Sequence, residues 1–213
     1  MTAFVFCLQI SGLSQKAKVG VSGGVALANM NATIDGEKQN WDGKSGYTAG
    51  MIMDVPFAPH FSFRPGVHYV QKGTVQQETT GNTTEKIFIA LRYAELTFNF
   101  LFNTNTTGAK GNFFVGAGPA VSLNLPSKTV TKTGGVKTEG KINFGNTIAE
   151  DLKGVDYGVN FLIGCKITGG MILSANYTHG LRNLVPDGYM TDDKLKNTCL
   201  SFQLGVLFNN NSK

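Results

Sequence analysis

Apolar and polar residues alternate with a period of two along most of the chain. Val19, Val21 and Val25 are separated by small or polar residues, and Phe98 and Phe100 continue the same pattern further along. Such alternation is typical of a β-strand with one apolar and one polar face. No helical period and no tandem repeat competes with it. The sequence therefore predicts eight strands, within residues 19–27, 47–55, 61–70, 87–102, 113–123, 155–164, 171–178 and 200–208.

The connections between these strands alternate in length. Short connections fall at residues 56–60, 103–110 and 168–170, and long polar loops fall at residues 29–45, 74–85, 126–153 and 182–196. An even number of strands with short turns at one end and long loops at the other is typical of outer-membrane barrels. We predict an all-β, eight-stranded antiparallel up-and-down transmembrane β-barrel with short periplasmic turns, long extracellular loops and both termini facing the periplasm.

The two faces of the strands favour a membrane barrel over a soluble one. One face is bulky and apolar, whereas the other carries Gly, Ser, Thr, Asn and single charges, which suits the narrow lumen of eight strands. Aromatic residues also form two bands, as membrane interfaces select. Tyrosines mark the long-loop ends and phenylalanines the short-turn ends: Tyr47, Tyr69, Tyr157 and Tyr177, and Phe61, Phe102, Phe113 and Phe208.

Composition narrows the class further. The 213 residues suffice for one sizeable domain, and charged residues make up 15%, below the typical share of about 25%. The net charge is +5, but Lys and Arg are scattered singly, so we expect no nucleic-acid partner. Residues 4–13 resemble the apolar part of a secretory signal peptide without its positive region. We therefore expect a signal peptide in residues 1–15 and a single barrel domain over residues 16–213.

Four segments, in order along the chain, resemble strands of the PorT-like outer-membrane β-barrel family. They are residues 61–73 (FSFRPGVHYVQKG), 91–97 (LRYAELT), 116–119 (GAGP) and 176–184 (NYTHGLRNL). The resemblance implies an eight-stranded barrel in the outer membrane of a Gram-negative envelope, and a link to protein secretion. The chain departs from the family pattern at Arg64, Gly66 and Asn176, where Gln, Glu and Arg are frequent, so the interior charge pairs are expected to be rearranged.

The candidate chemistry lies on the predicted inner face. Arg64 and His68 share this face of one strand, and Glu95 occupies it on the next. A hairpin centred near residue 79 would bring Arg64 beside Glu95. Because an unpaired buried charge is costly, we expect Arg64, His68 and Glu95 to form a polar network in the lumen with a structural role.

Nothing in the sequence indicates a catalytic or metal site. The three histidines lack metal-ligand spacing, and Cys165 and Cys199 fit neither a zinc nor a redox motif. His179, Ser174 and Asp156 fall near strand ends but form no recognisable catalytic set. We therefore expect a protein that is not an enzyme and has no cofactor or metal.

The sequence leads to one functional prediction and leaves three alternatives open. We predict a monomeric, non-enzymatic outer-membrane protein that acts as an envelope assembly or interaction component. Its expected partners are outer-membrane lipid and other envelope or secretion proteins, with the loop at residues 126–153 as a docking surface for a partner or an anionic polysaccharide. The alternatives are a small solute pore, a soluble ligand-binding barrel and a lipid-modifying enzyme, although eight strands leave little room for an open pore.

Overall fold

The structure is a computed structural model that describes residues 17–39, 41–80, 83–105, 111–188 and 193–208. The expected signal peptide at residues 1–15 lies outside the described residues. The strands are β1 (Lys18–Ile34), β2 (Glu37–Gln39), β3 (Asp42–Ala58), β4 (Phe61–Thr80), β5 (Thr83–Asn103), β6 (Asn112–Thr133), β7 (Val136–Lys141), β8 (Val155–Lys166), β9 (Met171–Gly180) and β10 (Lys194–Leu207). A single 3-10 turn, η1 (Thr168–Gly170), joins β8 to β9. Across the described residues, no helix is both long enough and apolar enough to span a membrane.

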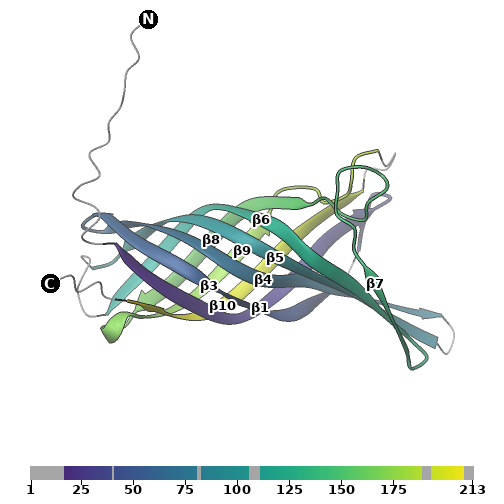
Figure 1. Cartoon of the computed structure of the whole chain (residues 1–213), viewed down its shortest axis with the longest axis horizontal. Coiled ribbons are helices and arrows are strands. Elements are labelled where there is room, and N and C mark those ends of the chain that lie inside the picture. The colour runs from purple at the N-terminus through teal and green to yellow at the C-terminus, as the bar shows by residue number, and fades with distance from the viewer. Residues whose placement is uncertain (1–16, 40, 81–82, 106–110, 189–192, 209–213) are drawn as a thin grey trace, which may run out of the picture.

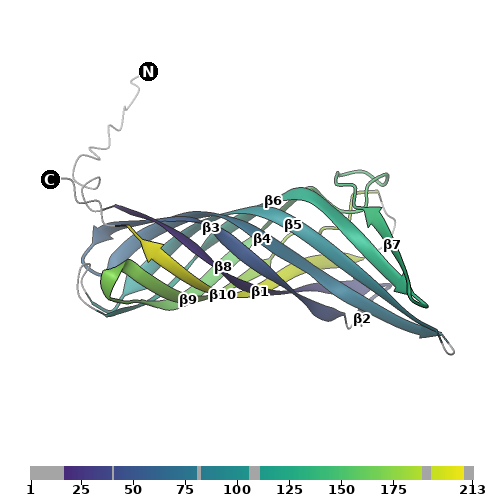
Figure 2. The same cartoon turned by 60° about the horizontal axis from the view of Figure 1, so that its bottom comes forward.

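Eight of these strands close into an antiparallel up-and-down barrel (Figures 1 and 2). The order around the ring is β1, β3, β4, β5, β6, β8, β9 and β10, and β10 pairs back onto β1 from Gly20↔Leu207 to Thr33↔Lys194. The start of β1 and the end of β10 lie at the same end of the barrel as η1. The eight predicted strands and the predicted fold class are therefore confirmed.

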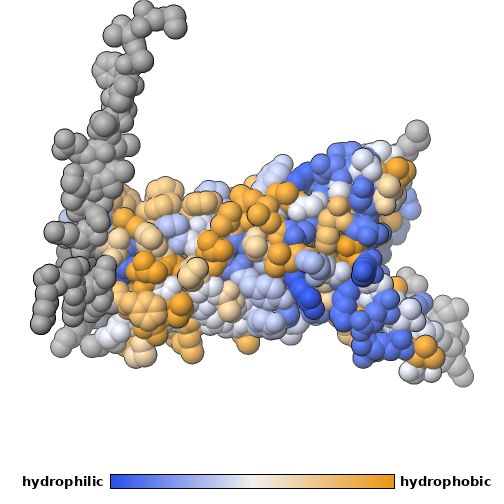
Figure 3. Space-filling view, viewed as in Figure 1, coloured by the Kyte–Doolittle hydropathy of each residue, from blue (hydrophilic) through white to orange (hydrophobic). Residues whose placement is uncertain are grey.

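The outward side chains are apolar and the inward ones are mostly small or polar. Val25 is 56% exposed whereas its neighbour Ala26 is fully buried, and Phe100 is 58% exposed whereas Leu101 is 1% exposed. Figure 3 shows the resulting hydrophobic band around the left half of the molecule. A soluble barrel would place its apolar face inside, so this arrangement is that of a barrel in lipid.

Aromatic side chains gather at both edges of the apolar band. Tyr47 and Tyr69 lie with ring centroids 5.6 Å apart near the long-connection end. Phe61 and Phe102 meet edge to face at 5.5 Å at the short-turn end. Both pairs join neighbouring strands, and such belts mark the two membrane–water interfaces of an outer-membrane barrel.

The prediction of long loops was wrong in part, because several barrel strands continue far beyond the apolar band. β4 reaches Thr80 and pairs with β5 from Thr83, while β6 reaches Thr133 and turns back into β7. These segments are rich in Thr and Val, which favour strands, and each finds a neighbour to continue the ladder. We call residues 74–80, 83–90, 128–133 and 136–141 the projecting sheet; it extends past the barrel rim at the lower right of Figure 1.

Two irregularities mark the point where the projecting sheet leaves the barrel. Gly73 has φ of 134°, and a Cβ atom there would lie 1.9 Å from the carbonyl oxygen of Ile89. On β6, two residues separate Leu125 from Lys128, whereas their β5 partners Arg92 and Ala90 are separated by one. Such a β-bulge bends and twists a strand, so the sheet changes direction here.

Candidate functional site

A buried ionic network crosses the upper part of the lumen, on the side of the projecting sheet. Lys72 Nζ donates to Glu95 Oε2 at 2.5 Å and to Ser122 Oγ at 3.1 Å, and Ser122 Oγ donates to Glu95 Oε2 at 2.8 Å. The ammonium also lies 5.1 Å from the centroid of the Tyr93 ring. Three strands thus contribute to one cluster, which satisfies charges that would otherwise be costly to bury.

The same network continues toward the wall formed by β8 and β10. Asn197 Nδ2 donates to the hydroxyl oxygen of Tyr93 and to Asp156 Oδ2, each at 3.0 Å. All three side chains are buried. Two hydrogen-bonded groups, joined by the contact between Lys72 and the Tyr93 ring, therefore cross the upper lumen from β4 to β10.

A second ionic cluster lies nearer the short-turn end. Asp54 Oδ2 accepts from Arg64 Nη2 at 2.8 Å and pairs with Lys166 Nζ at 2.7 Å. The Arg64 guanidinium also stacks 4.4 Å from the centroid of the Phe114 ring. Two cations share one carboxylate here, so this cluster carries a net positive charge.

Between the two clusters lies a small cavity of about 40 Å³, which is lined by both polar and apolar side chains. His68 Nε2 and Ser22 Oγ, which are 3.0 Å apart, lie on its wall together with Asn99, Asn160 and Thr178. Thr48 Oγ1 and Arg64 Nε also line this region and find no hydrogen-bond partner among the described residues. The volume admits two or three water molecules, which would satisfy such atoms, but not a sizeable ligand.

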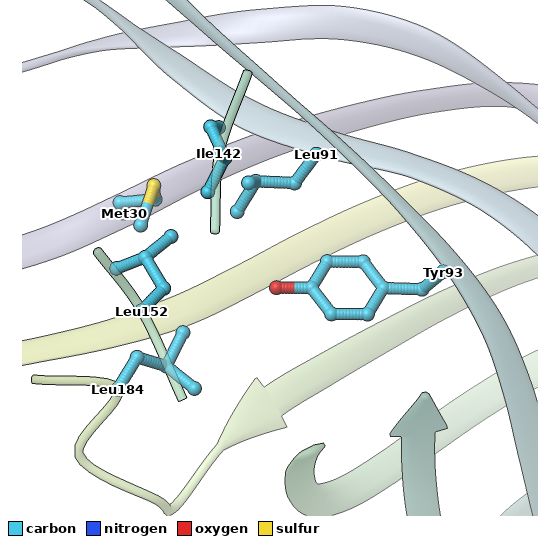
Figure 4. Close-up of a cluster of buried hydrophobic side chains, with 6 residues drawn as sticks. All are labelled: Met30, Leu91, Tyr93, Ile142, Leu152 and Leu184. Atoms are coloured by element: carbon cyan, nitrogen blue, oxygen red, sulfur yellow. The ribbon is translucent and has the colours of Figure 1, made fainter. Parts of the chain in front are cut away.

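A cluster of buried apolar side chains lies around Tyr93, which belongs to the upper network (Figure 4). Ile142 and Leu152 of the β6–β8 connection, with Leu184 of the β9–β10 connection, pack on inward-facing side chains of β1 and β5. Backbone hydrogen bonds fix this arrangement, since Lys153 N donates to Leu184 O and Leu184 N donates to Leu195 O. We call residues 142–153 and 181–188 the cap. The cap folds over the barrel mouth.

A second apolar layer closes the lumen below the cavity. It is formed by inward-facing side chains from six strands or connections around the ring: Ile52, Leu101, Phe114, Leu162, Ile172 and Leu207. Ile52, Leu162 and Ile172 also line the cavity and form its floor. The lumen is thus filled above and below the cavity.

The sequence matches the outer membrane protein beta-barrel domain family over residues 13–185. The chain belongs to this family. The protein is therefore located in the outer membrane, in agreement with its apolar exterior and polar interior. A comparison with curated proteins returns no match.

Three solved outer-membrane proteins resemble the barrel in structure. OprG from Pseudomonas aeruginosa is 11% identical with a TM-score of 0.48, over 91% of this chain and 97% of that protein. Neisserial surface protein A is 16% identical with a TM-score of 0.44, over 90% and 99%. The attachment invasion locus protein Ail of Yersinia pestis, in complex with the heparin analogue sucrose octasulfate, is 12% identical with a TM-score of 0.42, over 91% and 99%.

The three residues predicted for the lumen of the barrel all point inward and are buried, but they do not contact one another as expected. Arg64 lies opposite Asn99 and His68 lies opposite Glu95. The predicted pair between Arg64 and Glu95 is wrong, because β4 and β5 continue to Thr80 and Thr83 and the hairpin turns later than residue 79. Arg64 bonds to Asp54 and Glu95 bonds to Lys72 instead.

Sequence reasoning missed the partners of these charges. The pairs Ile52↔Gly66 and Val55↔Phe63 place Asp54 across from Arg64 on the neighbouring strand. Asp54 occupies an inward-facing position in the period-two alternation of its strand. This signal could have identified Asp54 as a partner of Arg64. Lys166 comes from a strand far along the chain, so only the closed ring brings it to Asp54.

The residues considered for catalysis do not converge. Ser174 lines the cavity and Asp156 belongs to the upper network, so both point inward. His179 points outward, unlike Ser174 on the same strand. Its ring stacks on that of the exposed Tyr177, with ring centroids 6.3 Å apart. Within the part of the chain that the structure describes, no three His, Cys, Asp or Glu side chains group to hold a metal ion.

The projecting sheet offers a polar surface outside the lumen. Its edge strand β7 is exposed throughout and pairs only with β6. On its other side, the pairing of β4 with β3 reaches Val75, so residues 76–80 form a second edge among the described residues. Glu139 of β7 accepts hydrogen bonds from Lys128 Nζ at 2.8 Å and from Lys137 Nζ at 2.5 Å. These hydrogen bonds lower the pKa of the Glu139 carboxyl to about 2.

Proposed function

We propose that this outer-membrane barrel is a non-conducting, non-enzymatic assembly or interaction component of the envelope. The observation that carries the proposal is the filled lumen: apolar layers lie above and below a cavity of about 40 Å³. A barrel of this kind offers a partner its outer surface and not a passage. The projecting sheet, with its two strand edges, is the surface on which a partner protein would bind.

A link to protein secretion is part of this proposal. It rests on the resemblance of residues 61–73 and 176–184 to strands of the PorT-like family. An envelope or secretion protein is accordingly the class of partner that we propose. The inward Ser174 and Asp156 and the outward His179 favour a binding role over a lipid-modifying one.

Affinity purification from native outer membranes in mild detergent tests the proposal. We would compare the full chain with a variant in which residues 130–139 are replaced by a short Gly-Ser turn, which removes the tip of the β6–β7 hairpin. Stoichiometric co-purification of envelope proteins with the full chain, and its loss in the variant, is the expected result. Heat-dependent gel mobility of both proteins serves as the control that the barrel itself still folds.

Single-channel recording in planar bilayers separates this proposal from the small-pore alternative. The purified barrel should produce no conductance steps. Regular steps together with recovery of a lone monomer from native membranes would contradict the interaction role and favour a pore. The enzymatic alternative predicts a changed lipid profile when the gene is deleted, whereas the proposal predicts an unchanged one.

A further inference from the structure

The projecting sheet segregates its charges by face. Lys86, Lys132 and Lys137 lie directly opposite one another on three neighbouring strands, through the pairs Lys86↔Lys132 and Lys132↔Lys137. Lys128 and Lys141 form a second such pair, four residues from the first row on β6 and β7. Residues directly opposite or two apart on paired strands share a face. We call Lys86, Lys128, Lys132, Lys137 and Lys141 the lysine ladder.

This face carries one compensating carboxylate. Glu139 accepts from Lys128 and Lys137, and these ion pairs confirm that the side chains share the face. Glu85 belongs to the opposite face, where it accepts a hydrogen bond from Thr133. Among the described residues, Lys86, Lys132 and Lys141 form no ion pair. Like charges directly opposite on a sheet are destabilising. The Lys132 ammonium lies 5.1 Å from the centroid of the Phe88 ring, but this contact supplies no counter-charge.

The lysine ladder continues the lipid-facing side of the barrel. On β5 and β6 the paired residues are Ala94↔Leu123, Arg92↔Leu125 and Ala90↔Lys128. Leu123 points outward, and this register shows that Lys128 points outward as well. Leu123 is 44% exposed within the apolar exterior. Figure 3 shows hydrophilic residues gathered over the β6–β7 hairpin, beyond the hydrophobic band. The cations therefore face the same surroundings as the lipid-exposed residues below them.

The lower row of the lysine ladder lies close to the headgroup region, and the upper row lies beyond the headgroups of an ordinary phospholipid. At about 3.4 Å per residue and a strand tilt of about 45°, Lys128 lies roughly 10 Å above Leu123 and the Lys132 row roughly 20 Å above it. Polar headgroups extend about 5–8 Å beyond the hydrocarbon on each side of a phospholipid bilayer, and further where they carry several sugars. Arg92 lies one row below Lys128 and is also exposed.

We propose that the lysine ladder binds the phosphate groups of glycolipid headgroups in the outer leaflet around the barrel. A row of ammonium groups at headgroup height is electrostatically complementary to lipid phosphates, and such cations contribute to membrane attraction one by one. Bound phosphates would offset the repulsion between the paired lysines and fix the projecting sheet relative to the membrane surface. This inference goes beyond the proposed function, since it concerns lipid and requires no partner protein.

The test compares two triple variants with the wild type. K86Q/K132Q/K141Q neutralises three ladder lysines and leaves both Glu139 ion pairs intact. K38Q/K194Q/K196Q is the matched control: it removes the same charge from the same end of the barrel, at β2 and β10, where Lys38 and Lys194 both pair with Thr33. Heat-dependent gel mobility verifies that all three proteins fold.

Immobilised protein in detergent would be incubated with mixed micelles that contain diphosphorylated lipid A or its dephosphorylated form, and the retained lipid would be quantified. Wild type and the matched control should retain the phosphorylated lipid, with retention that falls as salt is raised. The ladder variant should need roughly tenfold more lipid for equal retention. Dephosphorylated lipid should bind to the wild type as weakly as phosphorylated lipid binds to the ladder variant.

Three outcomes would overturn the proposal. Equal retention by the wild type and the ladder variant would show that these lysines do not bind the lipid. Equal loss of lipid retention in both triple variants would mean that net charge, and not the position of these lysines, determines binding. Retention of soluble heparin without retention of lipid A would assign the surface to a free polyanion and not to the membrane.

Discussion

Lys72 Nζ lies 2.5 Å from Glu95 Oε2 inside the barrel, and the two side chains are only 1% and 8% exposed. The pair joins neighbouring strands, and Ser122 ties it to a third. Removal of one partner would leave the other as an uncompensated buried charge. Substitutions in this pair therefore test whether the two buried charges depend on each other.

Lys72→Met should destabilise the barrel by about 3–5 kcal/mol, because Glu95 would lose its cation while it stays buried. The double variant K72M/E95L should recover most of that loss, since no unpaired charge remains. The free energy of unfolding in urea, followed in lipid vesicles by gel mobility, provides the measurement. A double variant no more stable than K72M would contradict the assignment of Glu95 as the partner of Lys72.

The exposed pairs of the projecting sheet should behave differently. Lys128→Gln removes an ion pair with half-exposed partners, and solvent screening leaves such pairs little effect on stability. The free energy of barrel unfolding should therefore stay close to that of the wild type. A loss as large as that of K72M would show that the projecting sheet and the barrel unfold as one unit.

The Glu139 carboxyl should titrate at low pH. Hydrogen bonds from Lys128 and Lys137 lower its pKa to about 2. Because the folded-state pKa lies below the unfolded value, the contribution of these contacts to hairpin stability is complete above about pH 4.5 and disappears as the pH falls through about 2. An NMR titration of the carboxyl carbon measures the midpoint, which should rise toward the ordinary value in K128Q/K137Q. An unchanged midpoint in that variant would contradict the contacts.

The cap should loosen when its apolar contacts are cut. Leu184 is fully buried against side chains of the cap and the barrel wall, so Leu184→Ala should cost about 2–5 kcal/mol of local stability. Hydrogen exchange of residues 142–153 should accelerate, while the amides of β8 and β9 within the barrel keep their protection. Val136→Ala, at an exposed site on β7, is the control and should leave the cap unchanged.

Gly73 is one of the two irregularities at the bend above the barrel. Gly73→Ala should destabilise the barrel, since a Cβ atom would lie 1.9 Å from the Ile89 carbonyl oxygen and φ of 134° is strained for any other residue. Gly135→Ala provides a comparison, because Gly135 also has positive φ but nothing lies within 4 Å of its Cβ position. The melting temperature should fall further for Gly73→Ala than for Gly135→Ala. Equal shifts would mean that backbone strain alone, and not the close carbonyl, limits this position.

The strands and their faces could be predicted because period-two alternation is a local signal. Val25 and Phe100 point outward and Ala26 inward, as their parity requires. Most of the projecting sheet was mistaken for loops, although residues 87–90 were predicted as strand, since its exposed Lys and Thr residues give no clear apolar face. The backbone hydrogen bonds of this sheet depend on neighbouring strands that cannot be identified from the sequence alone.

The interior contacts could be predicted only in part. Arg64, His68 and Glu95 were correctly placed on the inner face, but a shift in the hairpin turn changes every partner across the pair of strands. Lys166 and Leu184 reach their sites through the closure of the ring and through a long connection. Such contacts depend on the whole topology and have no local signature.

The pairing of β1 with β10 has a consequence for how the protein is made. Gly20 and Leu207 are neighbours in the ring but lie at opposite ends of the described chain. During synthesis β1 therefore emerges first and waits for its partner until nearly the whole chain has been translated, with an unpaired edge and an apolar face available for aggregation. An unfolded chain therefore carries an aggregation-prone strand until β10 is available to pair with it. Ring closure is then the late, slow step of assembly, because it joins the most distant parts of the sequence.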